Sequence, residues 1–421
     1  MVSRYIMRGI TMAVTLLLAS SLCSAQKKTD WQRDLDSLAV WLPQKHYNLF
    51  MYRNRKYFED GIAKLKKMAP FYSNSEMVLK IQQLLVKFGD AHTGANYPQE
   101  MSPNRIYPLG LDCYGKDYYV TTTSKKYKNL LGARITAING HTMYNIENQF
   151  SSLVVVDSRS NILNIVPKIM AFAQIYDFFG IAKGDSIVIS YEKGGTKGRT
   201  TMKTCPINAR SMVNIMPLKQ TMHIVNSKTL FTDTYMPDDK IYYVQYNRCW
   251  NRELEEKYGS RERAAQMPSF TELSRRIEST LKEKDVKKLV FDLRYNGGGN
   301  SAPFTSLVKK LAEQLKDRKD IKCYAVIGRA TFSSGILNSL DLKKYLNATF
   351  VGEVTAGCAN HLGEIRSFGL PTSGLEIMYS TKYFRQNDIT DGPIHPDVMK
   401  ETAYDDFIHG TDPVLEWIKE Q

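Results

Sequence analysis

The segment that most constrains the fold is LVFDLRYNGGG, residues 289–299, in which a short apolar run leads into a triple glycine. The apolar residues predict a buried strand, and the glycines predict a sharp turn directly after it. Glycine accepts positive φ angles and leaves the backbone open, so that a substrate carbonyl can approach closely. Such a turn is a natural oxyanion hole, in which uncovered backbone amides bind a developing negative oxygen. An ordinary strand-to-helix turn is the alternative interpretation.

A second turn, ATFSSG at residues 330–335, follows another predicted strand and opens a helix that runs through Leu340. Ser333 lies at the entrance of this helix, where the helix dipole and free N–H groups favour an alkoxide nucleophile and the oxyanion that follows. The amide of Ser334 is then a further donor beside that of Gly298. An N-cap role for Ser333 is the alternative, because serine is common at helix starts.

The N-terminus has the layout of a secretory signal. Two arginines precede an apolar run over residues 10–22, and the small residue Ala25 follows. We expect residues 1–25 to be a signal peptide and the mature protein to be periplasmic or extracellular. The apolar run is too short for a comfortable membrane span, so we expect no stable membrane insertion. Lipid anchoring at Cys23 is an alternative that we do not favour, since Leu22 is bulkier than lipoprotein processing prefers.

The chain carries 57 basic and 43 acidic side chains, a net charge of +14, which loss of the two signal-segment arginines lowers to +12. The lysines lie in scattered short groups, so we interpret the charge as a solvated basic surface and expect no nucleic-acid partner. The other five cysteines form no CxxC pair, and neither HExxH nor a nucleotide-binding loop occurs. The sequence therefore predicts no disulfide framework, no metal and no cofactor.

The sequence pattern of residues 26–104 predicts an N-terminal helical domain. The clearest helix covers 73–88, where Ser73 and Glu76 fit a capping box and apolar residues recur at helical spacing. Gly89 ends this run.

Residues 105–205 predict a β-rich domain, with strand-like segments at 118–122 and 186–190. The stretch 131–140, which ends in I-N-G, resembles the segment of PDZ domains that leads into such a turn. PDZ domains bind peptide tails by adding a strand to a sheet edge. We therefore expect a PDZ-like domain, with a generic β domain as the alternative.

Strands and helices alternate through residues 225–421. Predicted strands cover 241–246, 289–293 and 324–327, with helical patterns between them. Such alternation predicts an α/β layer with a largely buried sheet. Ligand sites in these sheets lie beyond the carboxyl ends of the strands, where both the NGGG and the FSSG turns fall.

The order of four motifs closely resembles the C-terminal processing, or tail-specific, serine peptidases: D-L-R-Y-N-G-G-G, T-F-S-S-G, V-G-E-V-T-A-G and I-H-P-D. This resemblance implies an α/β multidomain fold with an N-terminal helical region, a PDZ-like domain and an α/β sandwich core of the ClpP/crotonase-like type. It also implies that Ser333 is the nucleophile and that Gly297, Gly298 and Ser334 form the oxyanion hole.

One position departs from the Ser-Lys dyad that bacterial members commonly use. Cys358 stands where those enzymes carry lysine, which favours the tricorn-core-like branch of the family. That branch uses a histidine near the start of its peptidase portion, and the segment G-D-A-H-T-G implies that His92 is the general base. An imidazole suits this role because its ordinary pKa is about 6.5. The same branch implies Asp391, shortly before the P-D segment, as the carboxylate that orients the imidazole.

These features predict an exported serine peptidase that hydrolyses protein or peptide substrates, with their C-terminal tails as a preferred region. His361 and His395 remain alternatives for the base, and Asp90 is a rival of Asp391 with a more structural role. A catalytically inactive relative that binds peptides or apolar ligands is the main alternative function, because the dyad lysine is missing. A purely structural surface protein is a further alternative.

Overall fold

The computed structural model describes residues 29–96, 105–206, 211–386 and 391–421. The predicted signal peptide, with Cys23, lies outside these ranges. None of the helices within them combines the length and apolar character that a bilayer-spanning segment needs.

The C-terminal region is built on a six-stranded sheet with the order β16-β13-β12-β11-β10-β9. Its strands are β9 (Phe231–Met236), β10 (Ile241–Tyr246), β11 (Lys288–Asp292), β12 (Lys322–Ile327), β13 (Thr349–Gly352) and β16 (Val398–Met399). All neighbours pair in parallel except β9, which is antiparallel to β10. Because parallel strands end at the same edge, the turns after β11 and β12 meet there. The predicted strands 241–246, 289–293 and 324–327 are confirmed, to within a few residues at their ends.

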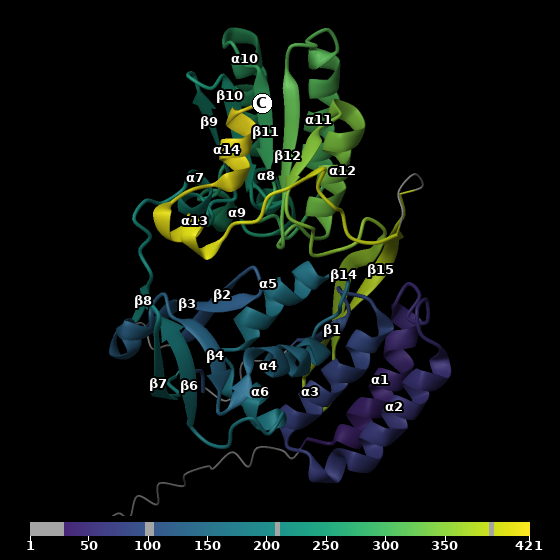
Figure 1. The fold of residues 1–421 in the computed structure, drawn as a ribbon. Coiled ribbons are helices and arrows are strands. Elements are labelled where there is room, and N and C mark those ends of the chain that lie inside the picture. Colours follow the sequence, from purple (N-terminus) through teal and green to yellow (C-terminus); the bar gives the residue numbers. More distant parts are fainter. Residues whose placement is uncertain (1–28, 97–104, 207–210, 387–390) are drawn as a thin grey trace, which may run out of the picture.

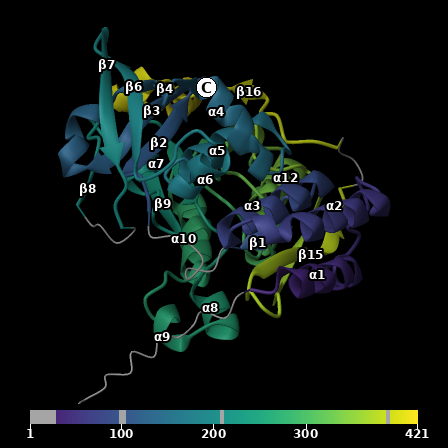
Figure 2. The same cartoon turned by 90° about the horizontal axis from the view of Figure 1, so that it is seen from below.

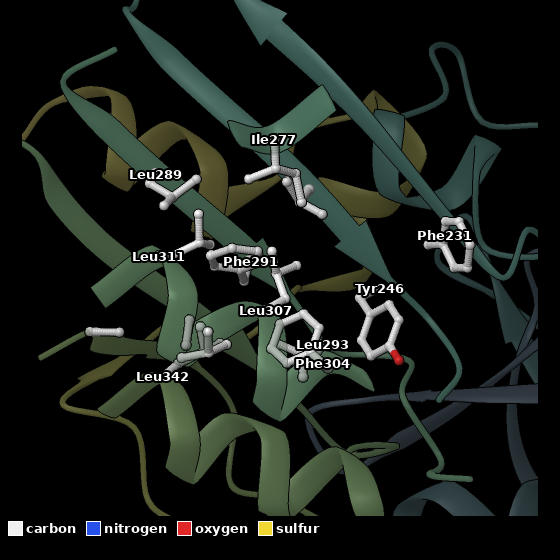
Figure 3. Close-up of a cluster of buried hydrophobic side chains, with 14 of the residues drawn as sticks. Phe231, Tyr246, Ile277, Leu289, Phe291, Leu293, Phe304, Leu307, Leu311 and Leu342 are labelled. Carbon is white, nitrogen blue, oxygen red and sulfur yellow. The ribbon is translucent and has the colours of Figure 1, made fainter. Parts of the chain in front are cut away.

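Each face of this sheet carries its own hydrophobic core, because successive residues of a strand point to opposite faces. On one face Phe291 of β11 packs with Phe304 and Leu307 in the cluster drawn in Figure 3. The helices that cover this face are α10 (Phe270–Glu283), α11 (Ala302–Leu315) and α12 (Ser334–Leu346). On the other face Val290 packs with Ile418 of α14 (Pro413–Lys419). Both faces are thus buried, as the apolar strand sequences require.

The N-terminal region is helical, as predicted. Its helices are α1 (Trp31–Lys45), α2 (Arg55–Met68) and α3 (Asn74–Leu85), with 3-10 turns at η1 (Ala69–Phe71) and η2 (Val86–Phe88). The predicted capping box is confirmed, since Ser73 caps α3 and Glu76 accepts from the Ser73 amide at 2.8 Å. Gly89 ends the run in the left-handed conformation with φ 71°.

A long hairpin from the C-terminal region completes the helical region. Strands β14 (His361–Gly369) and β15 (Glu376–Phe384) pair with each other, and β15 also pairs with β1 (Gly94–Asn96). Ile377 of this hairpin is fully buried in the same cluster as Leu38 and Leu85. Segments more than 280 residues apart along the chain thus share one core, and the loop before β1 is held against the C-terminal region (Figure 1).

The middle region contains a sheet, but it also contains helices that the sequence analysis did not predict. The strands are β2 (Leu109–Tyr114), β3 (Asp117–Ser124), β4 (Arg134–Ile138), β5 (His141–Thr142), β6 (Ser186–Lys193), β7 (Thr196–Lys203) and β8 (Met212–Asn214). The helices are α4 (Met143–Phe150), α5 (Arg159–Ile169) and α6 (Ala173–Phe178), with 3-10 turns at η4 (Lys125–Leu130) and η5 (Ser151–Leu153). The region is therefore mixed α and β rather than purely β-rich.

The middle region contacts the C-terminal region through ring stacking and hydrogen bonds. Tyr404 of α13 (Tyr404–His409) stacks on Tyr119 of β3 with ring centroids 3.9 Å apart. Ser158 donates to the carbonyl of Thr355 at 2.8 Å, from the turn that precedes α5. The short helices α7 (Met222–Val225), α8 (Arg252–Tyr258) and α9 (Arg261–Ala264) complete the described elements. The middle and helical regions both lie beneath the C-terminal sheet in Figure 1, and on different sides of the view in Figure 2.

Candidate active site

The glycine turn after β11 is shaped by Asn296. This side chain is fully buried, donates to the Tyr246 carbonyl at 2.8 Å and accepts from the Gly298 amide at 2.9 Å. Gly298 has φ 103° and Gly299 has φ 133°, a range that disfavours any other residue. The sequence N-G-G-G thus forms this turn because Asn296 supplies the internal partner and the two later glycines supply the conformation.

Ser333 lies against this turn in a strained conformation. Its φ is 52° and its ψ is −125°, immediately before the first residue of α12. A Cβ added to Gly298 would lie 2.8 Å from the Cβ of Ser333, so the two predicted turns touch. The Phe332 amide also donates to the Asn296 carbonyl at 2.9 Å. A non-glycine residue with such a φ costs on the order of 1–3 kcal/mol and is typical of functional sites.

The three predicted oxyanion donors differ in their present partners. The Gly298 amide is occupied by Asn296, so in this conformation it supports the turn. The amides of Gly297 and Ser334 have no acceptor among the described residues. The Ser334 hydroxyl donates to the Gly299 carbonyl at 2.7 Å, which ties the start of α12 to the turn. The donors that remain open are therefore those of Gly297 and Ser334.

His92 comes from the helical region and reaches the C-terminal region through its loop. Asp90 shapes this loop, because its carboxylate accepts from the His92 amide at 2.9 Å and from the Thr93 hydroxyl at 2.6 Å. The same carboxylate contacts Nε2 of His46 at 2.9 Å. Burial disfavours the Asp90 carboxylate, but these hydrogen bonds outweigh that effect and lower its pKa. Asp90 thus shapes the loop that carries His92, and its Oδ1 also lies 3.9 Å from Nδ1 of the His92 ring.

The His92 ring is buried and stacks on Phe332, the residue before Ser333. Their ring centroids lie 4.6 Å apart, and the ring of His361 stacks at 5.8 Å. Neither ring nitrogen of His92 has a hydrogen-bond partner among the described residues, so no bond joins it to Ser333. Burial lowers the pKa of His92 to about 4, with His361 adding to this effect and Asp90 opposing it. The structure brings His92 beside the nucleophile segment but does not form the Ser-His hydrogen bond.

His361, an alternative base, has one nitrogen fixed. Its Nδ1 lies 3.0 Å from the Cys358 carbonyl, which can only accept, so Nδ1 carries the proton. Its Nε2 has no partner among the described residues and holds a free lone pair. Burial lowers the pKa of His361 as well. The other alternative, His395, is exposed and lines none of the cavities around the site.

Besides Asp90, two further carboxylates lie near the histidines, and the sequence motifs point to only one of them. The predicted Asp391 is exposed and accepts from the Asn360 amide at 2.6 Å, with no bond to His92. Asp157 is half-buried and lines the same cavity as Asp391 and His92. Burial raises the pKa of Asp157 to about 7, and the nearby charge of Asp90 adds to this effect. No motif surrounds Asp157 in the sequence, so only the fold reveals it.

Cys358 does not replace the missing lysine as a base. Burial, with Asp157 and Asp391 adding, raises the pKa of its thiol to about 12. A thiol in this state stays protonated at neutral pH. All five cysteines of the described ranges have free thiols, and no group of three or more potential metal ligands occurs within these ranges.

Three adjoining cavities form a groove along the site. The central cavity, about 410 Å³, is lined by His92, Gly297 and Phe332. The central cavity shares His92 and Val155 with a second cavity of about 450 Å³, which we name the Asp157 cavity after one of its lining residues. The central cavity also shares Lys168 of α5 and Tyr295 of the C-terminal region with a third cavity of about 420 Å³, which we name the Arg329 cavity after one of its lining residues. The groove therefore runs past the glycine turn with space on both sides of it.

Comparison with known proteins shows that the fold of this chain is similar to that of solved peptidase structures. No protein-family model and no curated protein matches the chain. Mature CPAF in complex with lactacystin matches with a TM-score of 0.65 and 10% identity, over 93% of this chain and 97% of that chain. Another structure of mature CPAF gives 0.61 and 10%, over 92% and 95%. The tricorn protease gives only 0.42 and 15%, over 93% and 36%.

The mixed α/β multidomain fold thus resembles that of the S41 C-terminal processing peptidases. At this identity the likeness concerns the fold alone, and the roles of single residues depend on the geometry of the site.

Proposed function

We propose that this protein is a serine peptidase with Ser333 as nucleophile. The observation that carries the proposal is the positive φ of Ser333 at the start of α12, in contact with the glycine turn. Ser333 thus lies at a helix N-terminus and against the glycine turn, and the amides of Gly297 in this turn and of the adjacent Ser334 are open. The likeness of fold to S41 peptidases supports the same function.

The chemistry follows from this arrangement. The Ser333 oxygen attacks the carbonyl carbon of the scissile peptide, and its proton passes to an imidazole. The amides of Gly297 and Ser334 bind the oxyanion of the tetrahedral intermediate. The imidazolium then returns the proton to the leaving amine, and a water molecule hydrolyses the acyl-enzyme by the same steps. His92 is the proposed base because it stacks directly on Phe332.

The finer features of the family resemblance belong to the same proposal. We propose that residues 1–25 direct export and are removed after Ala25, so that the enzyme acts in the periplasm or outside the cell. The region 105–205 acts as the PDZ-like module that receives substrate tails, and the C-terminal region as a ClpP/crotonase-like core of the tricorn-core-like branch. No cofactor enters this mechanism.

A non-catalytic peptide-binding protein is the second candidate function, and three observations favour it. Neither ring nitrogen of His92 contacts Ser333, the Gly298 amide is already occupied, and Asp391 contacts Asn360 rather than His92. The groove itself would serve such a protein equally well.

A fluorophosphonate probe on the full mature chain separates the two functions. The peptidase proposal expects covalent labelling and hydrolysis of an unstructured protein, and Ser333→Ala should abolish both, with a rate loss of several powers of ten. Ser334→Ala is the matched control, because its hydroxyl only ties the turn to α12. Labelling that survives in Ser333→Ala, or a wild type with neither labelling nor hydrolysis, contradicts the proposal.

A further inference from the structure

The central cavity is the part of the groove that a residue next to the scissile bond would occupy. It is lined by His92 on one side and by Gly297 and Phe332 on the other, so it adjoins the proposed base, oxyanion donor and nucleophile segment. Cavities continue from it in both directions, through walls that it shares with the Asp157 cavity and the Arg329 cavity. A peptide bound along the groove would therefore place a side chain, and not its terminus, in the central cavity.

The charges around the central cavity are all of one sign. Its charged lining residues are Lys168 and Arg248, and its wall contains no Asp or Glu among the described residues. His92 adds no charge at neutral pH, because burial lowers its pKa to about 4. The neighbouring Asp157 cavity is mixed in charge, since Arg53 and Lys87 line it together with the carboxylates of Asp90, Asp157 and Asp391. The groove thus changes from mixed charge to purely basic charge across His92.

Neither basic group of the central cavity is neutralised by a described carboxylate. Lys168 donates to the Asn164 side chain at 2.6 Å and forms no ion pair within the described ranges. Burial lowers the pKa of Lys168, and Asp112, across the Arg329 cavity and beyond ion-pair distance, opposes this effect only in part. Arg248 is exposed and likewise has no ion pair with any residue that the structure describes.

The position of Arg248 is fixed relative to the glycine turn. The next residue, Cys249, donates its amide to the Gly298 carbonyl at 3.0 Å, and its carbonyl accepts from the Asn300 amide at 2.8 Å. A Cβ on Gly299 would lie 2.3 Å from the Cys249 carbonyl oxygen, so the two strands of backbone are in contact. The Arg248 backbone is therefore held beside the proposed oxyanion donors.

We propose that the central cavity selects an acidic side chain, Asp or Glu, next to the bond that is cleaved, with Arg248 and Lys168 as its specificity-determining residues. This inference rests on the proposed function and narrows its substrate class. Arginine binds a carboxylate through paired N–H groups, while lysine acts as a point charge. An unpaired basic cavity also repels a lysine or arginine side chain at the same position.

Matched peptides test this inference in two assays. One set of peptides differs only in having Glu, Gln or Lys at successive positions, and each is made with a free and with an amidated C-terminus. Cleavage by the wild type gives kcat/KM, and binding to the full-length Ser333→Ala variant gives Kd without turnover. We expect Glu to be preferred over Gln by about tenfold at one position in both assays, with Lys disfavoured. Amidation should leave this preference unchanged.

Charge reversal identifies the residues. Arg248→Glu should remove the preference for Glu and favour Lys, and Lys168→Glu should weaken the preference. Arg199→Glu makes the same charge change at an exposed position of strand β7 that does not line this cavity, and should leave the preference as in the wild type.

The outcomes separate this inference from the proposed function. Cleavage with no preference for Glu overturns the inference and leaves the peptidase proposal standing. A preference for Glu in binding without any cleavage supports the inference and contradicts the peptidase proposal. Loss of binding on amidation, with Glu and Gln equal, shows recognition of the C-terminal carboxylate and overturns the side-chain assignment.

Discussion

Replacement of Gly298 by alanine tests how far the glycine turn and Ser333 depend on each other. Gly298 has φ 103°, which costs any other residue on the order of 1–3 kcal/mol. The added Cβ would lie 2.8 Å from the Cβ of Ser333 and 3.1 Å from the Ser334 amide nitrogen. These atoms cannot retreat freely, because the Ser334 hydroxyl is bonded to the Gly299 carbonyl and α12 begins there. The substitution must therefore strain the turn, displace Ser333, or both.

The size of the effect follows from these costs. We expect Gly298→Ala to lower the free energy of unfolding by about 2 kcal/mol, which for a region of roughly 200 residues lowers Tm by about 4–8 °C. The rate of fluorophosphonate labelling should fall by about a hundredfold, because a shift of about 1 Å in a reacting atom has that effect. Gly297→Ala is the matched control for stability, since Gly297 has an ordinary φ and nothing lies within 4 Å of an added Cβ.

Differential scanning fluorimetry and labelling kinetics on the two variants measure both effects. Equal Tm values for Gly298→Ala and Gly297→Ala would refute the argument that the conformation of Gly298 and its contact with Ser333 matter. A lower Tm with unchanged labelling would show that the turn is strained but that Ser333 keeps its place.

Two further predictions concern stability. Asp34→Asn should lower Tm by more than Asp36→Asn, because buried Asp34 accepts from the amides of Thr372 at 2.7 Å and Ser373 at 2.8 Å. An unsatisfied buried donor costs roughly 1–3 kcal/mol, whereas the surface ion pair between Asp36 and Lys66 contributes under about 1 kcal/mol. His92→Phe should lessen the loss of stability between pH 6.5 and pH 4, measured by urea unfolding. The unfolded chain takes up a proton at His92 in this window and the folded chain, with a pKa of about 4, does not, so acid destabilises the wild type there.

The features that the sequence predicted correctly have local causes. The capping box joins Ser73 to Glu76, three positions further along the chain. The apolar residues before the glycines indicate by themselves that this strand is buried. The positive φ angles of Gly298 and Gly299 likewise follow a signal within the segment itself. These local signals suffice to place both turns at one edge of a parallel sheet.

The features that the sequence did not predict depend on distant contacts. Asp157 follows three valines and becomes notable only because the fold buries it beside Cys358, 201 residues further along the chain. The occupied amide of Gly298 depends on the rotamer of Asn296, which no periodicity encodes. The lowered pKa of His92 could not be predicted from the sequence either, because it results mainly from burial in the folded protein, where rings from other segments, Phe332 and His361, stack on the imidazole.

The environment of His92 sets what catalysis by this site requires. Stacking between Phe332 and His361 fixes the plane of the ring, but no described hydrogen bond fixes which nitrogen faces Ser333. A pKa of about 4 also makes the imidazolium roughly 3 kcal/mol less favourable than that of an ordinary histidine, and the proton taken from serine must reside there. A carboxylate brought to the ring offsets this cost, since a nearby negative charge stabilises the imidazolium. Asp90, whose Oδ1 lies 3.9 Å from Nδ1 of His92, already opposes the effect of burial in part, so catalysis through His92 requires a further contact that stabilises the imidazolium.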